Sequence, residues 1–564
     1  MRSVITRRRA TIRRGLLTGA LAGLLSGVLA AAVALGVAQL VAGLTGPLGS
    51  PVEAIGEVVI NHTPVALKEF AIAHFGSDDK NALVTGILLI LIGAAAVAGI
   101  LAARRLWQGL GVLAVFAVAG VAAAVSQPGA TGADVVPTLA GMVTAAAALV
   151  ILVRLARSAF PEVSRRVIDD GSAAAGIPVT ADDAAAANDP AAPPPPPPPG
   201  PRAGPGQPAG SSRRRFLITG AGAAAVAVSG GAAGQLLLGR FSVASSRAQV
   251  RLPVPAVAAR AVPAAAQLRV GGLSPFFTPN AQFYRVDTDL VIPQVAPDSW
   301  TLRIDGMVSR PVEITFDELL RMPLAEADIT LVCVSNAVGG PYAGNARWLG
   351  APLAMLLRRA GVRAGADQVL SAGTDGMTIS TPLQAVLDGR NALIAVGMNG
   401  QPLPVAHGFP ARMVVPGLYG YVSATKWVTR LTVTTFASQR AYWTQRGYAA
   451  QAPIKTESRI DVPKPLAQLP AGRVPVAGVA WAPHRGISAV EVSVDNGPWH
   501  AARLAAADGI DTWRQWMWAW DAVPGLHSLR ARATDGTGVT QTSQEDPPFP
   551  DGASGWDSVV VTVT

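Results

Sequence analysis

The stretch "DITLVCVSNAVGGPYAGNARWLGAPL", residues 328–353, contains the only cysteine of the 564-residue chain, Cys333. Its first part, "TLVCVSN", has the pattern of a short apolar strand that passes directly into a polar, Gly-rich loop. Such a loop can present a side chain to a pocket. A free cysteine taken alone is more often a small buried hydrophobe, and a single cysteine permits no internal disulfide. The folded parts of the chain are therefore expected to be held by their cores or by a cofactor.

The composition indicates a membrane protein of several domains. Half of the residues are apolar and only 15% are charged, which is too apolar for an ordinary soluble protein. The formal net charge is +10, but many of the basic residues flank apolar segments. In that position they indicate membrane topology rather than a phosphate-binding surface. Nucleic acid is therefore not expected as a partner.

Apolar segments suited to crossing a lipid bilayer, which takes about 20 helical residues, lie in the first half of the chain. Four long ones, and a fifth that is shorter and rich in small residues, lie at about 16–44, 81–103, 108–126, 134–153 and 216–238. Six arginines within the first 14 residues should hold the N-terminus in the cytoplasm, and Arg104 with Arg105 should return the chain to that side. We therefore expect a multi-pass cell-membrane protein with five helices.

A Pro- and Ala-rich stretch, residues 168–212, separates the fourth apolar segment from the fifth and includes seven consecutive prolines. It cannot bury a core and is expected to be a cytoplasmic linker. The following "SSRRRFL", residues 211–217, is either a positive flank of a membrane helix or a twin-arginine-like export signal. The second interpretation implies export of a folded, cofactor-loaded protein. Everything after Gly239 would then be extracytoplasmic.

The second half of the chain has the pattern of soluble domains. From about residue 265 helix-like and strand-like periods alternate. The last hundred residues contain short alternating strands divided by Asp-Gly, Asn-Gly and Pro-Gly turns, which predicts a small antiparallel β-sandwich. The tryptophans at 513, 516, 518 and 520 are expected to pack on that sandwich, although an aromatic platform for a carbohydrate is an alternative.

A second polar constellation lies in "LPVAHGFPARMVVPGLYGYVSATKWV", residues 403–428. Taken singly, His407 could be a core histidine and Arg412 a surface charge. Together they stand five residues apart around a proline and precede a Gly-rich turn, which makes a suitable anion cradle. Arginine can bind a phosphate through two nitrogens, and the N–H groups of the turn can donate further hydrogen bonds.

These two stretches resemble the sulfite oxidase family of molybdenum enzymes, in a membrane-anchored bacterial form. The resemblance covers about residues 265–564 and is carried by Cys333, Asn336, the segment "ARWLGAPL" at 346–353 and the His407–Arg412 stretch. It implies a molybdenum–molybdopterin cofactor whose metal is bound by the Cys333 thiolate. A soft thiolate suits such a metal, and the metal keeps the sulfur deprotonated. A haem is not expected in this chain, which has no Cys-x-x-Cys-His motif.

The resemblance also implies the roles of individual residues. Two further segments carry it, "FFTPNAQFYRVDT" at 276–288 and "RAYWTQRGYAAQAP" at 440–453, although the second could equally be a surface loop. One residue is inserted before Lys426 relative to the family, so the part played by that lysine stays open. The implied cofactor-binding residues are Asn280, Tyr284, Arg285, His407, Arg412, Ser423, Ala424 and Thr425, and the implied catalytic residues are Cys333, Tyr448 and Arg347.

The expected fold class is multidomain: a transmembrane helical bundle, an α+β molybdopterin domain of the sulfite oxidase type and an immunoglobulin-like β-sandwich. The expected boundaries are 1–167 for four transmembrane helices, 168–212 for the linker, 213–240 for the signal-like fifth helix, 241–452 for the molybdopterin-binding oxidoreductase domain and 453–564 for the immunoglobulin-like dimerisation domain. A homodimer would use the last of these.

The expected function is oxygen-atom transfer on a small sulfur or nitrogen oxo-compound. Sulfite oxidation and sulfoxide reduction both stay open, because Asn336 is followed by Ala337–Gly340 and not by the consecutive arginines of the sulfite oxidases. A separate cytochrome or quinone-linked protein is expected to exchange electrons with the site. The alternatives are a membrane-tethered scaffold with a degenerate enzyme-like domain and, for the helices, a transporter or a partner-docking module.

Overall fold

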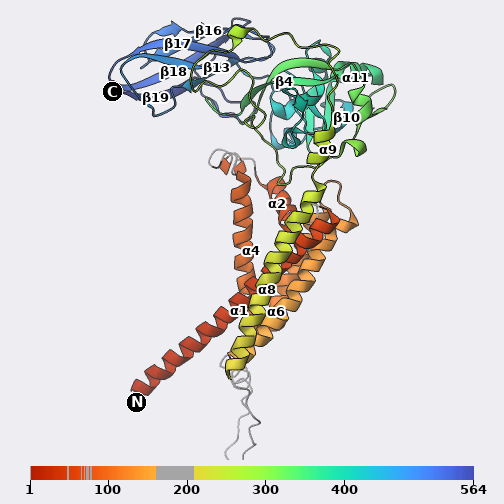
Figure 1. Ribbon diagram of the computed structural model, residues 1–564, viewed down its shortest axis with the longest axis vertical. Coiled ribbons are helices and arrows are strands. Elements are labelled where there is room, and N and C mark those ends of the chain that lie inside the picture. Colours follow the sequence, from red (N-terminus) through yellow and green to blue (C-terminus); the bar gives the residue numbers. More distant parts are fainter. Residues whose placement is uncertain are drawn as a thin grey trace, which may run out of the picture. The chain divides into compact units, whose positions relative to one another are not determined.

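The computed structural model describes residues 2–46, 50–64, 67–68, 70–71, 75, 79–160 and 209–564. The linker predicted at 168–212 lies outside these residues up to position 208. The chain divides into two compact units, Met1–His62 with Asp78–Phe241 and Thr63–Ser77 with Ser242–Thr564, and both appear in Figure 1.

The first unit is helical. Its main helices are α1 (Arg2–Thr45), α2 (Pro51–His62), α4 (Asp79–Arg104), α5 (Leu106–Val125), α6 (Val136–Ala159) and α8 (Ala209–Leu238). Helix α1 lies against α4, α6 and α8 (Figure 1). Within the part of the chain that the structure describes, five stretches are long and apolar enough to cross a membrane, namely Thr18–Thr45, Lys80–Arg104, Leu106–Val125, Gly132–Ala159 and Ser211–Gln249. The prediction of five such segments is confirmed on length and composition.

Glycines bring the helices of this unit into backbone contact. A Cβ added at Gly27 of α1 would collide with the carbonyl oxygen of Ala95 in α4, and one at Gly36 would collide with that of Ala227 in α8. Close approach through small residues is typical of helix packing in lipid, where burial of apolar surface supplies little driving force.

The second unit begins with two sheets that carry the candidate site, one mixed and one antiparallel. The first has the order β2-β1-β10-β5-β6, and the second has the order β3-β4-β7-β8 with β9 paired to β7. The strands of the first sheet are β1 (Thr301–Gly306), β2 (Val312–Thr315), β5 (Gln368–Gly373), β6 (Thr378–Pro382) and β10 (Val428–Thr434). The strands of the second are β3 (Ala325–Val332), β4 (Ala343–Pro352), β7 (Leu393–Met398), β8 (Gln401–Pro402) and β9 (Arg412–Val414).

Short helices cover these sheets, with ends set by local sequence. Helix α10 (Phe316–Leu320) begins at a capping box in which the side chains of Thr315 and Glu318 each accept from the other's backbone N–H. Helix α11 (Leu353–Ala360) ends at Gly361, whose φ of 72° suits glycine. Helix α12 (Leu383–Leu387) follows β6. The indole rings of Trp300, Trp348 and Trp427 are fully buried.

The last part of the chain forms two sheets around a shared apolar core, as expected for a β-sandwich. One sheet contains β11 (Glu457–Val462), β13 (Gly472–Trp481), β17 (Arg514–Ala522) and β16 (Arg503–Leu504). The other contains β12 (Gln468–Leu469), β19 (Asp557–Val563), β18 (Gly525–Asp535), β14 (Ile487–Val494) and β15 (Trp499–Ala501). Trp516 and Trp520 lie in the core between the sheets, while Trp513 packs with the preceding domain. Trp516, Trp518 and Trp520 therefore pack on the sandwich as predicted, whereas the prediction for Trp513 is wrong. The immunoglobulin-like assignment stays a prediction.

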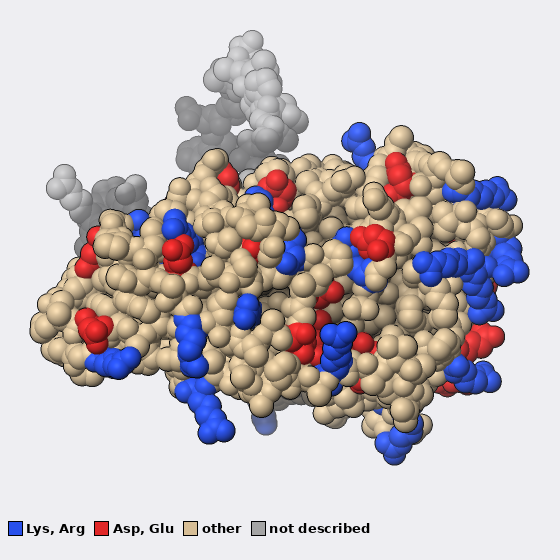
Figure 2. Space-filling view, turned by 90° about the horizontal axis from the view of Figure 1, so that it is seen from above, with Lys and Arg blue, Asp and Glu red and all other residues tan. Residues whose placement is uncertain are grey.

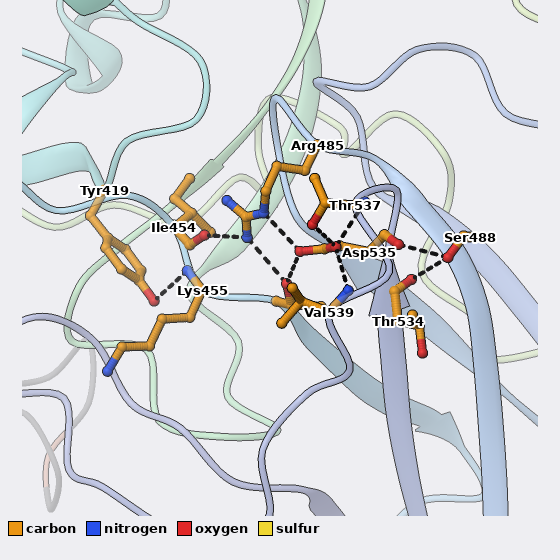
Figure 3. Close-up of polar contacts among 10 residues, drawn as sticks. Tyr419, Ile454, Lys455, Arg485, Ser488, Thr534, Asp535, Thr537 and Val539 are labelled. Atoms are coloured by element: carbon orange, nitrogen blue, oxygen red, sulfur yellow. Dashed lines mark hydrogen bonds and ion pairs between the residues drawn. The ribbon is translucent and has the colours of Figure 1, made fainter.

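An ion pair between Arg485 and Asp535 lies beside the segment that leads into the β-sandwich (Figure 3). Arg485 also binds this segment at Ile454. Arg485 Nε donates to Asp535 Oδ2 over 2.9 Å, and its Nη2 donates to the carbonyl oxygen of Ile454 over 2.9 Å. Asp535 Oδ1 also accepts from the hydroxyl of Thr537 over 2.6 Å. Burial raises the pKa of Asp535, but hydrogen bonds from Thr537, Arg485 and Thr456 outweigh it and hold that pKa well below its usual value.

Charged side chains are sparse and mixed on the face that Figure 2 shows. Lys and Arg side chains are interspersed there with Asp and Glu, and most of that face consists of other residues. The positive charge of the chain is therefore not gathered into one field on this face.

Candidate functional site

The Cys333 turn begins where β3 ends. The backbone N–H of Cys333 donates to the carbonyl oxygen of Tyr342 over 2.9 Å, and the N–H of Asn336 donates back to the carbonyl oxygen of Cys333 over 3.1 Å. The side-chain Oδ1 of Asn336 accepts from the N–H of Tyr342 over 2.7 Å. The asparagine thus closes the turn in which the cysteine lies.

The thiol of Cys333 lies in a desolvated place, with 8% of the residue exposed. Burial raises the pKa of the Cys333 thiol, while hydrogen bonds from the backbone and side chain of Ser335 lower it by less. Burial also raises the pKa of the neighbouring Tyr284, a shift that a charged Cys333 increases and Arg412 opposes. The uncharged neighbours Ser335 and Tyr284 do not stabilise a thiolate enough to offset burial. A deprotonated Cys333 therefore needs a positive charge beside its sulfur.

The second part of the site is the loop from His407 to Lys426. Gly408 has a φ of 107°, and a Cβ there would lie 3.0 Å from Cβ of Arg412 and 3.1 Å from Cα of Lys426. Only glycine fits such a conformation and such a close approach. The turn brings His407, Arg412 and Lys426 into one region.

Arg412 is a buried cation, with 5% of the residue exposed. Its Nη1 donates to the carbonyl oxygen of His407 over 3.1 Å, its Nη2 donates to that of Ala424 over 3.3 Å, and its guanidinium lies 5.1 Å from the ring centroid of Trp348. Its Nε has no hydrogen-bond partner among the described residues. Burial lowers the pKa of Arg412 to about 10. A desolvated guanidinium with an unused donor is suited to bind an anion.

Two further cations share one carboxylate. Lys426 Nζ lies 2.7 Å from Asp287 Oδ2, and Arg285 Nε lies 3.0 Å from the same oxygen. Burial lowers the pKa of Lys426 to about 8. Burial first, then the charges of Arg412 and Lys426, lower the pKa of His407 to about 4, although its ring donates to the backbone of Asn280. His407 is therefore neutral at physiological pH within a region of net positive charge.

Three residues predicted to bind the cofactor use their side chains elsewhere in the fold. Ser423 Oγ donates to the carbonyl oxygens of Leu418 and Tyr419, each over 3.0 Å. The hydroxyl of Thr425 lies 2.5 Å from that of Ser371. Ala424 contributes a carbonyl oxygen, which Arg412 binds. This segment shapes the loop, and only its backbone is left to contact a ligand.

The structure does not bring Arg347 to the thiol. Arg347 Nη2 lies 2.7 Å from Asp328 Oδ2, and its Nε donates to the other carboxylate oxygen over 2.8 Å. Asp328 lies five residues before Cys333 on β3, directly opposite Arg347 in the register. Arg347 is thus paired with Asp328, and its catalytic role stays a prediction.

The predicted tyrosine, Tyr448, lies in an aromatic cluster. Its ring centroid is 5.4 Å from that of Tyr421, 5.1 Å from that of Trp443 and 5.0 Å from that of Phe549. The loop between the first two apolar helices also reaches this cluster, because Lys68 Nζ lies 5.6 Å from the ring centroid of Trp443. The sequence offers no signal for that contact.

The residues present fit a molybdopterin-type group. Among the described residues, no three His, Cys, Asp or Glu side chains gather to hold a metal by themselves, so a metal on Cys333 would need further ligands from a cofactor. The unused donor of Arg412 and the positive region around it suit the phosphate of such a group. Of the predicted residues, Tyr284 links the two parts, because the charges of both Cys333 and Arg412 act on it.

Comparison with known proteins agrees with this geometry. Residues 289–443 match the model of the oxidoreductase molybdopterin binding domain. The chain is 32% identical over 288 residues to sulfite oxidase of Gallus gallus, a match that covers 43% of this chain and 62% of that protein. Residues 289–443 thus match a molybdopterin-binding oxidoreductase domain, and the chain is similar to sulfite oxidases at about 30% identity. The predicted molybdopterin-dependent oxidoreductase domain is thereby confirmed.

Other similar proteins extend over different shares of the chain. Nitrate reductase [NADH] 2 of Nicotiana tabacum is 31% identical over 194 residues, which are 30% of this chain and 21% of that protein. The sulfane dehydrogenase SoxCD of Paracoccus pantotrophus has a TM-score of 0.46 and 23% identity over 54% of this chain and 86% of that one. The chain thus spans less than two thirds of the length of the curated relatives it matches.

Proposed function

We propose that this protein is a membrane-anchored, extracytoplasmic molybdenum-cofactor oxidoreductase that transfers an oxygen atom to or from a small sulfur or nitrogen oxo-compound. One observation carries the proposal. Tyr284 lies close enough to both the sole thiol, Cys333, and the buried cation, Arg412, to be affected by the charge of each. A thiol that burial keeps protonated and a cation without a carboxylate bound to it both call for a ligand.

In this proposal the two sides of the site have separate tasks. Cys333 provides the thiolate ligand of the metal, and Arg412 binds the phosphate of the pterin with its free Nε. Neutral His407 can exchange hydrogen bonds with the pterin without adding charge. When bound, the molybdenum–pterin group supplies two-electron oxygen-atom transfer. The protein excludes water from it, because Cys333, His407 and Arg412 are all buried.

The charges at the Cys333 turn favour a neutral substrate over a small dianion. The four residues after Asn336 carry no charge, and a Cβ on Gly339 would collide with the carboxylate of Asp557. Arg459 reaches the turn by donating to the carbonyl oxygen of Gly340 over 3.0 Å, but it is paired with Asp461 over 2.8 Å. A sulfoxide or N-oxide needs no cluster of cations, so reduction of such a compound fits better than oxidation of sulfite.

The membrane location is supported by the outer faces of the helices. Large apolar side chains are exposed there, as expected of a surface that faces lipid: Leu89, Ile90, Val115, Val118, Val143, Val228 and Leu236. Basic residues at Arg104, Arg105 and Arg154 against Glu53 and Glu57 near the other ends favour a cytoplasmic N-terminus.

Helix α8, which contains the twin-arginine-like residues, is proposed to stay in the membrane after export. A Cβ at Gly230 would lie 2.8 Å from the carbonyl oxygen of Gly36, and one at Gly234 would collide with that of Gln39. Arg240 Nη2 also donates to the carbonyl oxygen of Leu44 over 2.5 Å. Helix α8 is thus packed along α1, so cleavage would remove part of the bundle.

Two partners belong to the proposal. Oxygen-atom transfer moves two electrons per turnover, so a separate cytochrome or quinone-linked protein must supply or accept them. A homodimer would form through the sandwich, where three large apolar side chains are exposed: Leu526 on β18, Val560 on β19 and Leu466 just before β12.

The deciding experiment quantifies molybdenum and pterin in the full-length protein and in Cys333→Ser, and measures turnover with methionine sulfoxide and with sulfite. We expect about one metal per wild-type chain, turnover of the sulfoxide, and loss of activity in the variant. A protein free of molybdenum would favour the scaffold alternative. Equal activity in the two forms would refute the role of the thiolate.

A further inference from the structure

A group of buried polar atoms lies next to the Cys333 turn, at the start of β11. Both carboxyl oxygens of Glu457, Nδ2 of Asn336 and Nε1 of Trp481 have no hydrogen bond of good geometry to any described residue. These residues are 2%, 1% and 0% exposed. Glu457 and Trp481 stand directly opposite each other in the register of β11 and β13, and the amide of Asn336 lies beside the carboxyl group.

Four such atoms on three neighbouring residues require an explanation, since the great majority of buried polar groups have partners. Their chemistry is complementary, because Asn336 Nδ2 and Trp481 Nε1 are donors while the Glu457 carboxyl group accepts. A single water molecule can accept from two N–H groups and donate to a carboxyl oxygen. Buried waters typically make about three such bonds.

The cations around Glu457 are committed to other acids. Lys455 Nζ lies 3.0 Å from Asp551 Oδ1. Arg459 Nε lies 2.8 Å from Asp461 Oδ1. The charge of Glu457 thus has no cation of its own, which makes its ionisation costly in this setting.

The remaining charged and titratable neighbours do not change this balance. Asp557 of β19 is a second acid and disfavours a negative charge on Glu457, and the hydroxyl of Tyr419 lies nearby with a pKa that burial and Glu457 raise. Burial raises the pKa of Glu457 to about 8, against smaller opposing effects of Asn336 and Lys455. The carboxyl group is therefore protonated at neutral pH.

We propose that Glu457, Asn336 and Trp481 enclose an internal water and that Glu457, as an uncharged acid, positions Asn336 and through it the Cys333 turn. The connection is short, because Asn336 donates to the carbonyl oxygen of Cys333 and accepts from the N–H of Tyr342. The inference rests on the proposed function only in taking Cys333 as the metal ligand. Glu457 is the first residue of β11, so the sandwich would hold the Cys333 turn in place through this one uncharged side chain.

The protonation state can be tested by infrared spectroscopy on the full-length protein in detergent. At neutral pH we expect the carbonyl-stretch band of a protonated carboxyl group, lost in Glu457→Gln and lost in the wild type when the pH exceeds about 8. Glu313→Gln, a change to an exposed acid on β2, should leave the band in place. Spectra of the wild type and Glu457→Gln that match in this region would overturn the proposal.

The positioning role can be tested without any metal. Cys333 is the only thiol, so the rate at which a thiol reagent labels the cofactor-free protein reports on its turn. Glu457→Gln should react as slowly as the wild type, whereas Glu457→Leu and Asn336→Ala should react about fivefold faster, since one buried hydrogen bond contributes about 1 kcal/mol. If Glu457→Leu fails to fold, Asn336→Ala decides.

Equal labelling rates in Asn336→Ala and the wild type would overturn the positioning role. Neither readout depends on molybdenum, so a failure here is distinct from a failure of the proposed enzyme activity.

Discussion

The Cys333 turn and the His407–Lys426 loop face the same ligand in this account, yet they are built in opposite ways. The turn is closed by backbone and amide hydrogen bonds and is surrounded by groups that are neutral, including Tyr284 and the acid Glu457. The loop concentrates cations whose charge is only partly balanced by Asp287. In the proposed function, the loop would recognise the anionic part of the cofactor, while the turn would hold a sulfur whose deprotonation depends on the bound metal.

The largest expected effect on turnover comes from a substitution in the Cys333 turn, the side of the site without charged groups. Cys333→Ser should reduce turnover by more than about 100-fold, because even residues that only orient metal ligands typically contribute 10–100-fold. The melting temperature of the cofactor-free protein should stay close to that of the wild type, since serine nearly matches cysteine in size. Turnover and calorimetry on the same preparations check both parts, and a variant with wild-type turnover would contradict the assignment.

A substitution of Arg412 in the cationic loop should weaken cofactor binding but stabilise the cofactor-free protein. Arg412→Met removes a buried charge-assisted contact worth about 3 kcal/mol, so retention of the pterin should fall about 100-fold. Without cofactor the same variant should be more stable than the wild type, because an uncompensated buried cation is replaced by an apolar chain of similar length. Pterin content and the melting temperature of cofactor-free protein measure the two effects.

Arg412→Lys serves as the matched control for that experiment, since it keeps the charge but loses the forked donors. It should retain more pterin than the methionine variant and less than the wild type. A methionine variant that binds pterin normally would show that Arg412 does not contact the phosphate.

The pH dependence of stability sharpens the comparison further. The pKa of His407 is lowered to about 4 from its usual 6.5, so the unfolded chain binds a proton at a higher pH than the folded one. The stability that this histidine contributes is complete above pH 6.5 and is lost as the pH falls towards 4, by up to about 3 kcal/mol. His407→Gln should flatten that part of the stability curve in denaturant titrations between these pH values. An unchanged curve would place the titration elsewhere.

The smallest effect on the site should come from Asp535, which belongs to neither the Cys333 turn nor the His407–Lys426 loop. Asp535→Asn breaks the ion pair with Arg485 and should destabilise the fold by about 2–3 kcal/mol, without a change in pterin content or in Cys333 labelling. The pKa of Asp535 is lowered in the fold, so its contribution is present above the usual pKa and is lost as the pH falls through the lowered value. Denaturant titrations at acidic and neutral pH check this, and altered labelling would contradict the separation.

The sequence predicts the parts of this protein that local patterns encode. The five apolar segments, the short strand before Cys333 and the His407–Arg412 turn all depend on residues that are neighbours in the chain. It does not predict which ionic partner a residue takes up. Arg347 was expected at the reaction centre, but β3 places Asp328 opposite it.

The same limit explains the residues that sequence reasoning missed. Asp287 and Glu457 act through partners more than one hundred residues away, Lys426 and Asn336. A hydroxyl such as that of Thr425 looks like a ligand in the sequence, yet it lies within hydrogen-bond distance of the hydroxyl of Ser371 on β5. Only tertiary packing decides such pairings.

X-ray absorption at the molybdenum edge of the intact, purified protein would show whether the Cys333 sulfur binds the metal. We expect one sulfur neighbour more in the wild type than in Cys333→Ser, with the remaining coordination unchanged. A wild-type protein without molybdenum, or two spectra with the same number of sulfur neighbours, would contradict it.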